Sequence, residues 1–435
     1  MPVSVVSEVA RGLRRPAQAV RQRTSRASAG GGRLAGVDGL RLLAAAAVAA
    51  YHYLGTPTPH FWGEAYDLPR AAPLLHAVSG YGWLGVEAFF LISGFVICMS
   101  CWGRTPAQFA VSRISRLFPL YWAVVLIIVV TGTITVLAGQ RSGAPTDLRT
   151  TLGNLTMIPS PLGLDFTAGV AWTLWVEARF YLLMGALLLI GLTYRRAIAF
   201  GFLWLVLASM GRELHSTVLD ELLLSQYAGL FVTGLALYLM YRFGSNLLLW
   251  LLAGFAWCYT LTVLNDRVAT HATSNWAISA AVLTGFLLLL ALTGWGPLRH
   301  LQWRTLIYAG ALTYPFYLVH QSLGIPVTRG ILKTTPGLGL LPSIALGLLF
   351  SVLLAATLNR LIDRKLGRLL RHHLTTALNP APAEQARPTP LAPDKPHTPA
   401  PDTGAPSAPE AGNEPSAHCC DQVEGAYAHG HGVHR

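Results

Sequence analysis

Three ionisable side chains lie inside long apolar stretches of the sequence: His52, Glu177 and His320. A charged side chain at the centre of a bilayer costs roughly 3 kcal/mol on insertion scales, so such residues are usually functional. A rise of about 1.5 Å per residue along each expected helix places all three in the outer half of a membrane, with Glu87 as a weaker fourth member. A histidine near a carboxylate is suited to general-base catalysis, because the carboxylate fixes its tautomer and stabilises the imidazolium. The alternative is that each side chain only pairs with a neighbour and holds helices together.

A second group of candidates is basic. Arg113 and Arg116 are three residues apart and share one face of a helix. Two guanidinium groups in that arrangement suit a clamp for phosphate or pyrophosphate at the inner start of the third helix. Taken alone, however, the pair is more simply explained as a topology signal or a lipid headgroup contact. Arg41 lies at the inner end of the first helix, where an ion pair with Asp38 is its simplest role. Both groups together predict a phosphate-bearing donor held at the cytoplasmic face and chemistry deeper in the bilayer.

The composition indicates which elements position these residues. Of the 435 residues, 53% are hydrophobic and only 12% are charged, against about a quarter charged in soluble domains. A chain in lipid folds as helices or as a closed barrel, and these apolar runs are too continuous for barrel strands. We therefore expect an all-α, polytopic bundle of about ten transmembrane helices. The spans fall near residues 39–56, 80–101, 117–138, 172–191, 197–211, 225–242, 246–264, 275–293, 305–325 and 340–360.

Basic residues flank these spans mainly on alternate sides, which predicts an even number of helices with both termini in the cytoplasm. We expect a disordered basic arm over residues 1–36, a transmembrane domain over 37–372 and a disordered, Pro/Ala-rich cytoplasmic tail over 373–435. The location expected is the inner membrane of a bacterial cell.

The net charge of +12 sits mostly beside the spans and in the N-terminal arm. It therefore indicates contact with membrane lipid rather than with nucleic acid. Cys98 and Cys101 have the spacing of a redox pair, but buried small hydrophobic residues at a helix end are the simpler interpretation. No metal site and no permanently bound cofactor is expected.

Five short motifs occur in a characteristic order between about Asp38 and Arg360. They are VDGLR at 37–41 with His52 downstream, FFLISGF at 89–95, RISRLFPLY at 113–121, WTLWVE at 172–177 followed by Phe180 and Tyr181, and TYPFYLVH at 313–320. In these motifs the sequence resembles the acyltransferase-3 family of membrane-bound O-acyltransferases.

The resemblance implies acyl-CoA as co-substrate, with acetyl-CoA as the first expectation, and a glycan or other hydroxylated compound as acceptor. It implies that His52 is essential and that Arg113 and Arg116 serve the CoA end. We expect Asp38, Arg41 and Tyr317 to be supporting residues. Thr173 and Arg179 depart from a frequent serine and a frequent glutamine, which leaves the reaction class intact but the acceptor unidentified.

Three hypotheses follow. In the first, His52 deprotonates an acceptor hydroxyl that attacks the thioester, Glu177 orients the imidazole, and His320 binds the acceptor or shares the proton; an acyl-histidine intermediate is equally open. In the second, the buried histidines and glutamate form the proton relay of a transporter or flippase for a glycan or lipid-linked sugar. In the third, the chain is a membrane scaffold that binds partners through its tail.

Overall fold

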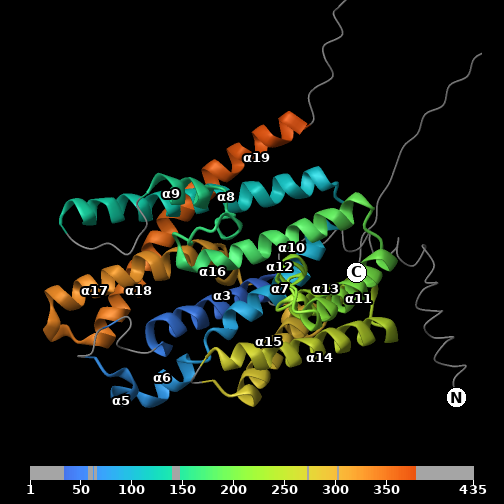
Figure 1. Ribbon diagram of the computed structural model, residues 1–435, viewed down its shortest axis with the longest axis horizontal. Coiled ribbons are helices and arrows are strands. Elements are labelled where there is room, and N and C mark those ends of the chain that lie inside the picture. Colours follow the sequence, from blue (N-terminus) through green and yellow to red (C-terminus); the bar gives the residue numbers. More distant parts are fainter. Residues whose placement is uncertain are drawn as a thin grey trace, which may run out of the picture. The chain divides into compact units, whose positions relative to one another are not determined.

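The long helices of the chain lie side by side in the computed structural model (Figure 1). The structure describes residues 34–56, 62, 66–139, 147–271, 274–300 and 303–378. Those ranges contain only helices, turns and irregular segments, with no strand. The predicted all-α bundle is therefore confirmed. All of the basic arm except its last three residues, and all of the tail except its first six, lie outside the described ranges. α3 begins inside the predicted arm, at Ala35.

Each of the ten predicted spans coincides with a helix. These are α3 (Ala35–Ala50) with η1 (Tyr51–Gly55), α7 (Leu84–Cys101), α8 (Pro106–Leu137), α10 (Trp172–Leu189), α11 (Tyr194–Glu213), α13 (Ala228–Phe243), α14 (Leu247–Ala269), α15 (Trp276–Gly294), α16 (Arg304–Val319) with η5 (His320–Gly324), and α18 (Leu340–Leu358) with η7 (Asn359–Asp363). Seven described segments are long and apolar enough to cross a membrane by length and composition alone. α3, α11 and α16 are not among the seven; α3 and α16 have 16 residues each before they continue as π-helix.

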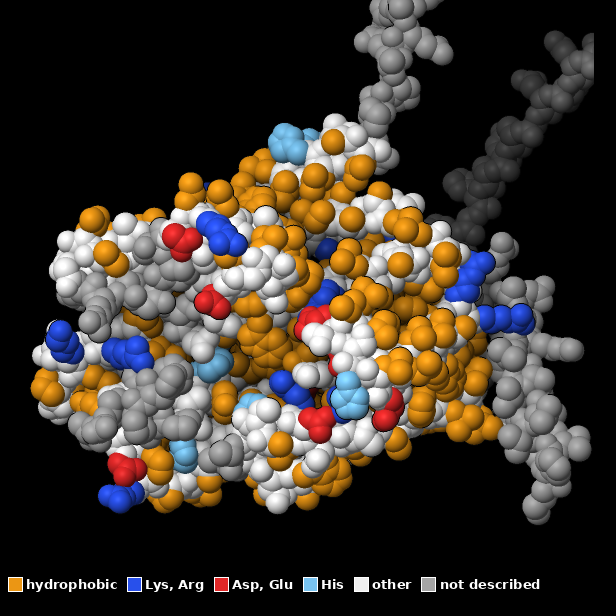
Figure 2. Space-filling model, viewed as in Figure 1, with side chains coloured by type: hydrophobic (Ala, Val, Ile, Leu, Met, Phe, Trp, Pro, Cys, Tyr) orange, Lys and Arg blue, Asp and Glu red, His pale blue; other side chains and the backbone are white. Residues whose placement is uncertain are grey.

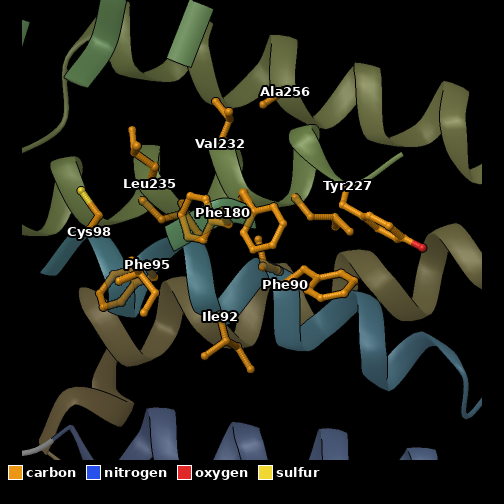
Figure 3. Close-up of a cluster of buried hydrophobic side chains, with 14 of the residues drawn as sticks. Phe90, Ile92, Phe95, Cys98, Phe180, Tyr227, Val232, Leu235 and Ala256 are labelled. Carbon is orange, nitrogen blue, oxygen red and sulfur yellow. The ribbon is translucent and has the colours of Figure 1, made fainter. Parts of the chain in front are cut away.

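The closest helix packing joins α7 and α13. A Cβ atom on Gly94 would lie 2.1 Å from the backbone oxygen of Phe231, and one on Gly234 would lie 2.1 Å from that of Leu91. In lipid, helices associate mainly through such close contacts between small residues, because lipid tails are as apolar as the side chains. Aromatic rings, among them those of Phe90 and Phe180, fill the space alongside (Figure 3). The Phe180 and Phe231 rings are stacked 4.2 Å apart.

Large apolar side chains also cover the outside of the bundle, as Figure 2 shows for one face. Leu126, Val130 and Ile134 follow one side of α8 at helical spacing, and each is 47–59% exposed. Leu349 and Leu353 do the same on α18. A continuous apolar exterior of this size fits contact with lipid tails rather than with water.

The connection between α8 and α10 packs against the bundle. It contains α9 (Leu148–Leu155), η2 (Ser160–Leu162) and η3 (Gly169–Ala171). Asn154 is fully buried and organises the connection, since its amide donates to the backbone oxygen of Asp165 and its carbonyl accepts from the backbone N–H of Thr167. The backbone N–H of Gly169 in turn donates to the Ser322 hydroxyl, 3.3 Å away in η5.

The remaining elements are shorter. They are α5 (Leu68–Ala71), α6 (Pro73–Ser79), α12 (Thr217–Leu223), η4 (Pro297–His300), α17 (Ile325–Thr334), η6 (Pro336–Leu338) and α19 (Arg364–Leu378). α19 continues six residues past the predicted domain boundary at residue 372. It lies against α8, because a Cβ on Gly367 would be 3.0 Å from the Ser115 backbone oxygen.

Candidate active site

The two candidate histidines lie on π-helical segments that face each other. His52 belongs to η1, where α3 ends, and His320 begins η5, where α16 ends. Such π-helical turns are rare and often occur at functional sites. Glycines allow the close packing around them. A Cβ on Gly55 would lie 2.4 Å from the Ser79 backbone oxygen, and one on Gly324 would lie 2.2 Å from the Tyr53 hydroxyl.

The imidazoles of His52 and His320 are hydrogen-bonded to each other. Nδ1 of His52 lies 3.0 Å from Nε2 of His320. The His320 side chain is fully buried, and its Nδ1 lies 2.8 Å from the backbone oxygen of Tyr317. Since a carbonyl only accepts, Nδ1 of His320 must carry the hydrogen, and Nε2 of the neutral ring is then an acceptor. His52 therefore donates from Nδ1 and keeps the lone pair on its Nε2.

That lone pair is the candidate reactive group of the site. Within the part of the chain that the structure describes, Nε2 of His52 has no hydrogen-bond partner, and the side chain is only partly buried. Two further bonds fix the backbone, since the Tyr53 hydroxyl donates to the His320 oxygen at 2.6 Å and the Thr56 hydroxyl donates to the His52 oxygen at 3.2 Å. The geometry holds a basic nitrogen in one orientation, as general-base catalysis requires.

Glu177 does not take the predicted place beside His52. It accepts a hydrogen bond from the Ser93 hydroxyl at 2.9 Å. One turn earlier on α10, the Thr173 hydroxyl is 3.1 Å from that of Tyr317. Arguments from depth along a helix place a residue only to within a turn and leave open which neighbour its side chain meets. The partner that holds the His52 imidazole is therefore His320, not the carboxylate.

Glu177 instead lines a small cavity of about 50 Å³ together with Arg41, Ser93, Tyr314 and Tyr317. Tyr317 connects this cavity to the histidines, because its ring centre is 5.7 Å from that of His320. The supporting role predicted for Tyr317 is consistent with this position.

Arg41 and Asp38 lie one turn apart on α3. Arg41 lies within electrostatic range of Glu177, Asp38 and Arg116. Asp38 is 95% buried and packs closely on Gly310, where a Cβ would lie 2.4 Å from the Asp38 Cβ. The ion pair between Asp38 and Arg41 stays a prediction. Arg41 also lines the cavity that contains Glu177.

The paired arginines lie near the other end of the described site. The Arg113 guanidinium lies 5.7 Å from the ring centre of Phe109 and 5.8 Å from that of Tyr181. Its Nε is buried and has no hydrogen-bond partner in the described ranges. Arg116 and Glu177 both lie within electrostatic range of Arg41, so the paired arginines are neighbours of the cavity that contains Glu177.

Glu87, the weaker fourth candidate, is occupied elsewhere. Its carboxylate is 97% buried and forms an ion pair with Arg267 at 3.1 Å. The Arg267 guanidinium also lies over the rings of Trp83 and Tyr227. Such a buried, fully engaged pair joins α7 to α14 and is a structural contact.

Sequence reasoning missed three contributors to the site. The Ser93 hydroxyl that donates to Glu177 lies within the FFLISGF motif, so the motif marked the residue but did not indicate its contact. Tyr53, directly after His52, carries no signal of its own, and neither does the π-helical winding of the two segments. The groups of histidine, cysteine and carboxylate side chains needed for a metal ion do not occur among the described residues.

Comparisons with known proteins show the family of the chain. The family model described as an acyltransferase domain, that of the acyltransferase-3 family, matches residues 34–360. Nodulation protein 10 of Rhizobium leguminosarum bv. viciae is 30% identical over 324 residues, which cover 65% of this chain and 81% of that protein. No solved structure shows a significant match. The matched region contains both histidines, Glu177 and the paired arginines, and the chain belongs to the acyltransferase-3 family of membrane acyltransferases.

Proposed function

We propose that the protein transfers an acyl group, acetyl in the first instance, from acyl-CoA to a hydroxyl of a glycan or another hydroxylated compound outside the cytoplasm. The observation that carries the proposal is the His52–His320 pair, which leaves an oriented basic nitrogen on His52. No cofactor is bound permanently in this scheme, and acyl-CoA is a co-substrate.

In the proposed reaction, Nε2 of His52 takes the proton of the acceptor hydroxyl while the oxygen attacks the thioester carbonyl. The C–S bond then breaks, and the CoA thiolate recovers the proton from His52. The products are the acyl ester and CoA, and the enzyme returns to its starting state. His320 stabilises the imidazolium by accepting from Nδ1 of His52 throughout. A covalent acyl-histidine route through the same nitrogen is the alternative.

Arg113 and Arg116 are the proposed contacts for the phosphates of the donor, because guanidinium groups bind phosphate in a bidentate manner. The Arg113 guanidinium lies over the ring of Tyr181, which belongs to α10. Thr173, also on α10, contacts Tyr317 beside His320. Eight residues of α-helix separate those two positions, about 12 Å. A donor held at Arg113 therefore needs a long, thin arm to bring its carbonyl to His52, and a CoA thioester has one.

The proposed setting is the inner membrane of a bacterial cell, with residues 1–36 and 373–435 in the cytoplasm. The donor would then bind at the cytoplasmic end of the bundle and the acceptor at the opposite end. Lipid surrounds the apolar exterior in this setting.

The test is turnover of labelled acetyl-CoA by protein reconstituted in nanodiscs. We expect wild type to bind and slowly hydrolyse the thioester, His52→Ala to bind it without turnover, and Arg113→Ala/Arg116→Ala to bind it at least tenfold more weakly. Arg304→Ala, which removes an exposed arginine at the start of α16, is the matched control and should behave as wild type. If wild type neither binds nor hydrolyses acetyl-CoA or longer acyl-CoA, the donor assignment is wrong, and proton-coupled transport becomes the leading hypothesis.

A further inference from the structure

A second cavity, of about 210 Å³, lies between the N-terminal half of α10 and the segment that joins α12 to α13. Its walls are aromatic, with Phe166, Trp172, Trp175 and Tyr227 all among the lining side chains. The rings of Trp172 and Tyr227 are 6.2 Å apart. None of these four residues takes part in the proposed chemistry at His52.

Charged side chains of both signs also line the cavity: Arg179, Asp220 and Glu221. The Arg179 guanidinium lies 5.1 Å from the Trp175 ring centre, donates to the backbone oxygen of Glu221 at 2.6 Å and forms an ion pair with its carboxylate. These contacts hold the Arg179 side chain in place, and only 13% of it is exposed.

Two polar atoms that belong to residues lining this cavity are buried and unsatisfied. Nε of Arg179, a donor, and Oδ1 of Asp220, an acceptor, have no hydrogen-bond partner among the described residues. Leaving such atoms unpaired is unfavourable, so a ligand that reaches either atom gains affinity. A hydroxyl group can satisfy either one, because it can donate to a carboxylate and accept from a guanidinium.

The mixture of charges narrows the ligand further. A cation would meet Arg179, and an anion would meet Asp220 and Glu221, so a neutral ligand fits the cavity best. The aromatic walls favour a ring with an apolar C–H face, and the polar groups favour several hydroxyls. A neutral sugar ring has both properties.

The cavity also lies close to the histidine end of the site. Trp172 directly precedes Thr173, whose hydroxyl contacts Tyr317 beside His320. The Phe90 ring, which lines the small cavity with Glu177, is 6.4 Å from that of Trp172. Arg113 by contrast lies at Tyr181, farther along α10.

We propose that this aromatic cavity is a subsite for a neutral sugar unit of the acceptor, held by stacking on Trp175 and by hydrogen bonds to Arg179 and Asp220. The proposal rests on the proposed function, because that function supplies the reason for an acceptor to bind near His52.

Saturation-transfer NMR on the nanodisc-embedded protein tests it, with methyl β-glucoside and methyl N-acetyl-β-glucosaminide as probes. We expect saturable binding by wild type, and binding about tenfold weaker in Trp175→Ala and in Arg179→Gln, from loss of the stacking face or of the charged donor. Trp175→Phe keeps an aromatic face and should stay within about threefold of wild type. Trp250→Ala, which removes an exposed tryptophan on α14, is the control and should bind as wild type.

The proposal is overturned if wild type binds neither glycoside. It is also overturned if Trp175→Ala and Arg179→Gln bind the glycosides as wild type does, once thermal melting has shown that both variants are folded. Should Trp175→Ala fail to fold, Arg179→Gln and Trp175→Phe decide the question. Choline or glycerol 3-phosphate binding more tightly than the glycosides would show a charged-ligand site and also refute it. Acetyl-CoA binding by wild type, measured separately, tests the proposed function, so the two failures are distinguishable.

Discussion

Replacing His320 by leucine isolates the contribution of the histidine pair. The change keeps an apolar side chain of similar size in a fully buried position, but it removes the nitrogen that accepts from Nδ1 of His52. His52 is then free to rotate and to carry its hydrogen on Nε2, where the proposed base needs a lone pair. We therefore expect His320→Leu to lose turnover while donor binding stays close to wild type.

The size of the loss follows from the kind of partner removed. When a carboxylate that holds a catalytic histidine is neutralised, the rate falls about 10⁴-fold. His320 is a neutral acceptor, so it stabilises the imidazolium less, and we expect a fall in kcat of about 10²–10³-fold, equivalent to about 3–4 kcal/mol. His320→Gln is the matched comparison. Its carbonyl can accept from His52 and its amide can donate to the Tyr317 oxygen, so the loss should be about tenfold or less.

Labelled acetyl-CoA hydrolysis in nanodiscs, or acetyl transfer once an acceptor is known, measures these effects. The same pair of substitutions at His52 gives the decisive contrast, because both His52→Leu and His52→Gln should abolish turnover. If His52→Gln is active and His320→Gln is not, the two histidines have the opposite roles and the tautomer assignment is refuted. Equal activity of His320→Leu and wild type would remove His320 from the mechanism altogether.

Three further predictions concern the scaffold. Gly94→Ala should destabilise the protein by about 1–3 kcal/mol or more, because its Cβ would lie 2.1 Å from backbone of α13, whereas Gly254→Ala meets no atom within 4 Å and should not lower the melting temperature. Asn154→Ala should cost about 1–3 kcal/mol, seen as a lower melting temperature, because buried backbone groups of the α8–α10 connection lose their partner; an unchanged melting temperature would contradict this. Burial, and then the charge of Arg267, lower the pKa of His271 from its ordinary value of 6.5, so the unfolded chain binds the proton more tightly. Stability should therefore fall as the pH drops below about 6.5. Between about pH 7.5 and pH 5.5, the melting temperature of wild type should fall further than that of His271→Phe, which keeps a ring stacked on Trp83. Parallel curves of melting temperature against pH would refute the reasoning.

The sequence alone determined the membrane character of the chain and the approximate limits of the ten helices that coincide with its long apolar runs. Long apolar runs dictate helices in lipid, because no other open structure satisfies its backbone hydrogen bonds there. The sequence also singled out His52, Glu177, His320 and the paired arginines, since ionisable groups stand out against an apolar background. The resemblance carried by five motifs indicated the family that the comparisons then showed.

Only the tertiary structure decided how those residues face one another. A helix such as α10 is apolar nearly all round, so its pattern does not indicate which side faces which neighbour. Three contacts depend on how each helix is rotated about its axis: the hydrogen bond between His52 and His320, the hydrogen bond from Ser93 to Glu177, and the ion pair of Glu87 with Arg267. The π-helical turns and the aromatic cavity arise from contacts between segments far apart in the chain. The sequence pattern gives the position of a residue along its helix, but packing between helices decides in which direction around the helix axis its side chain points.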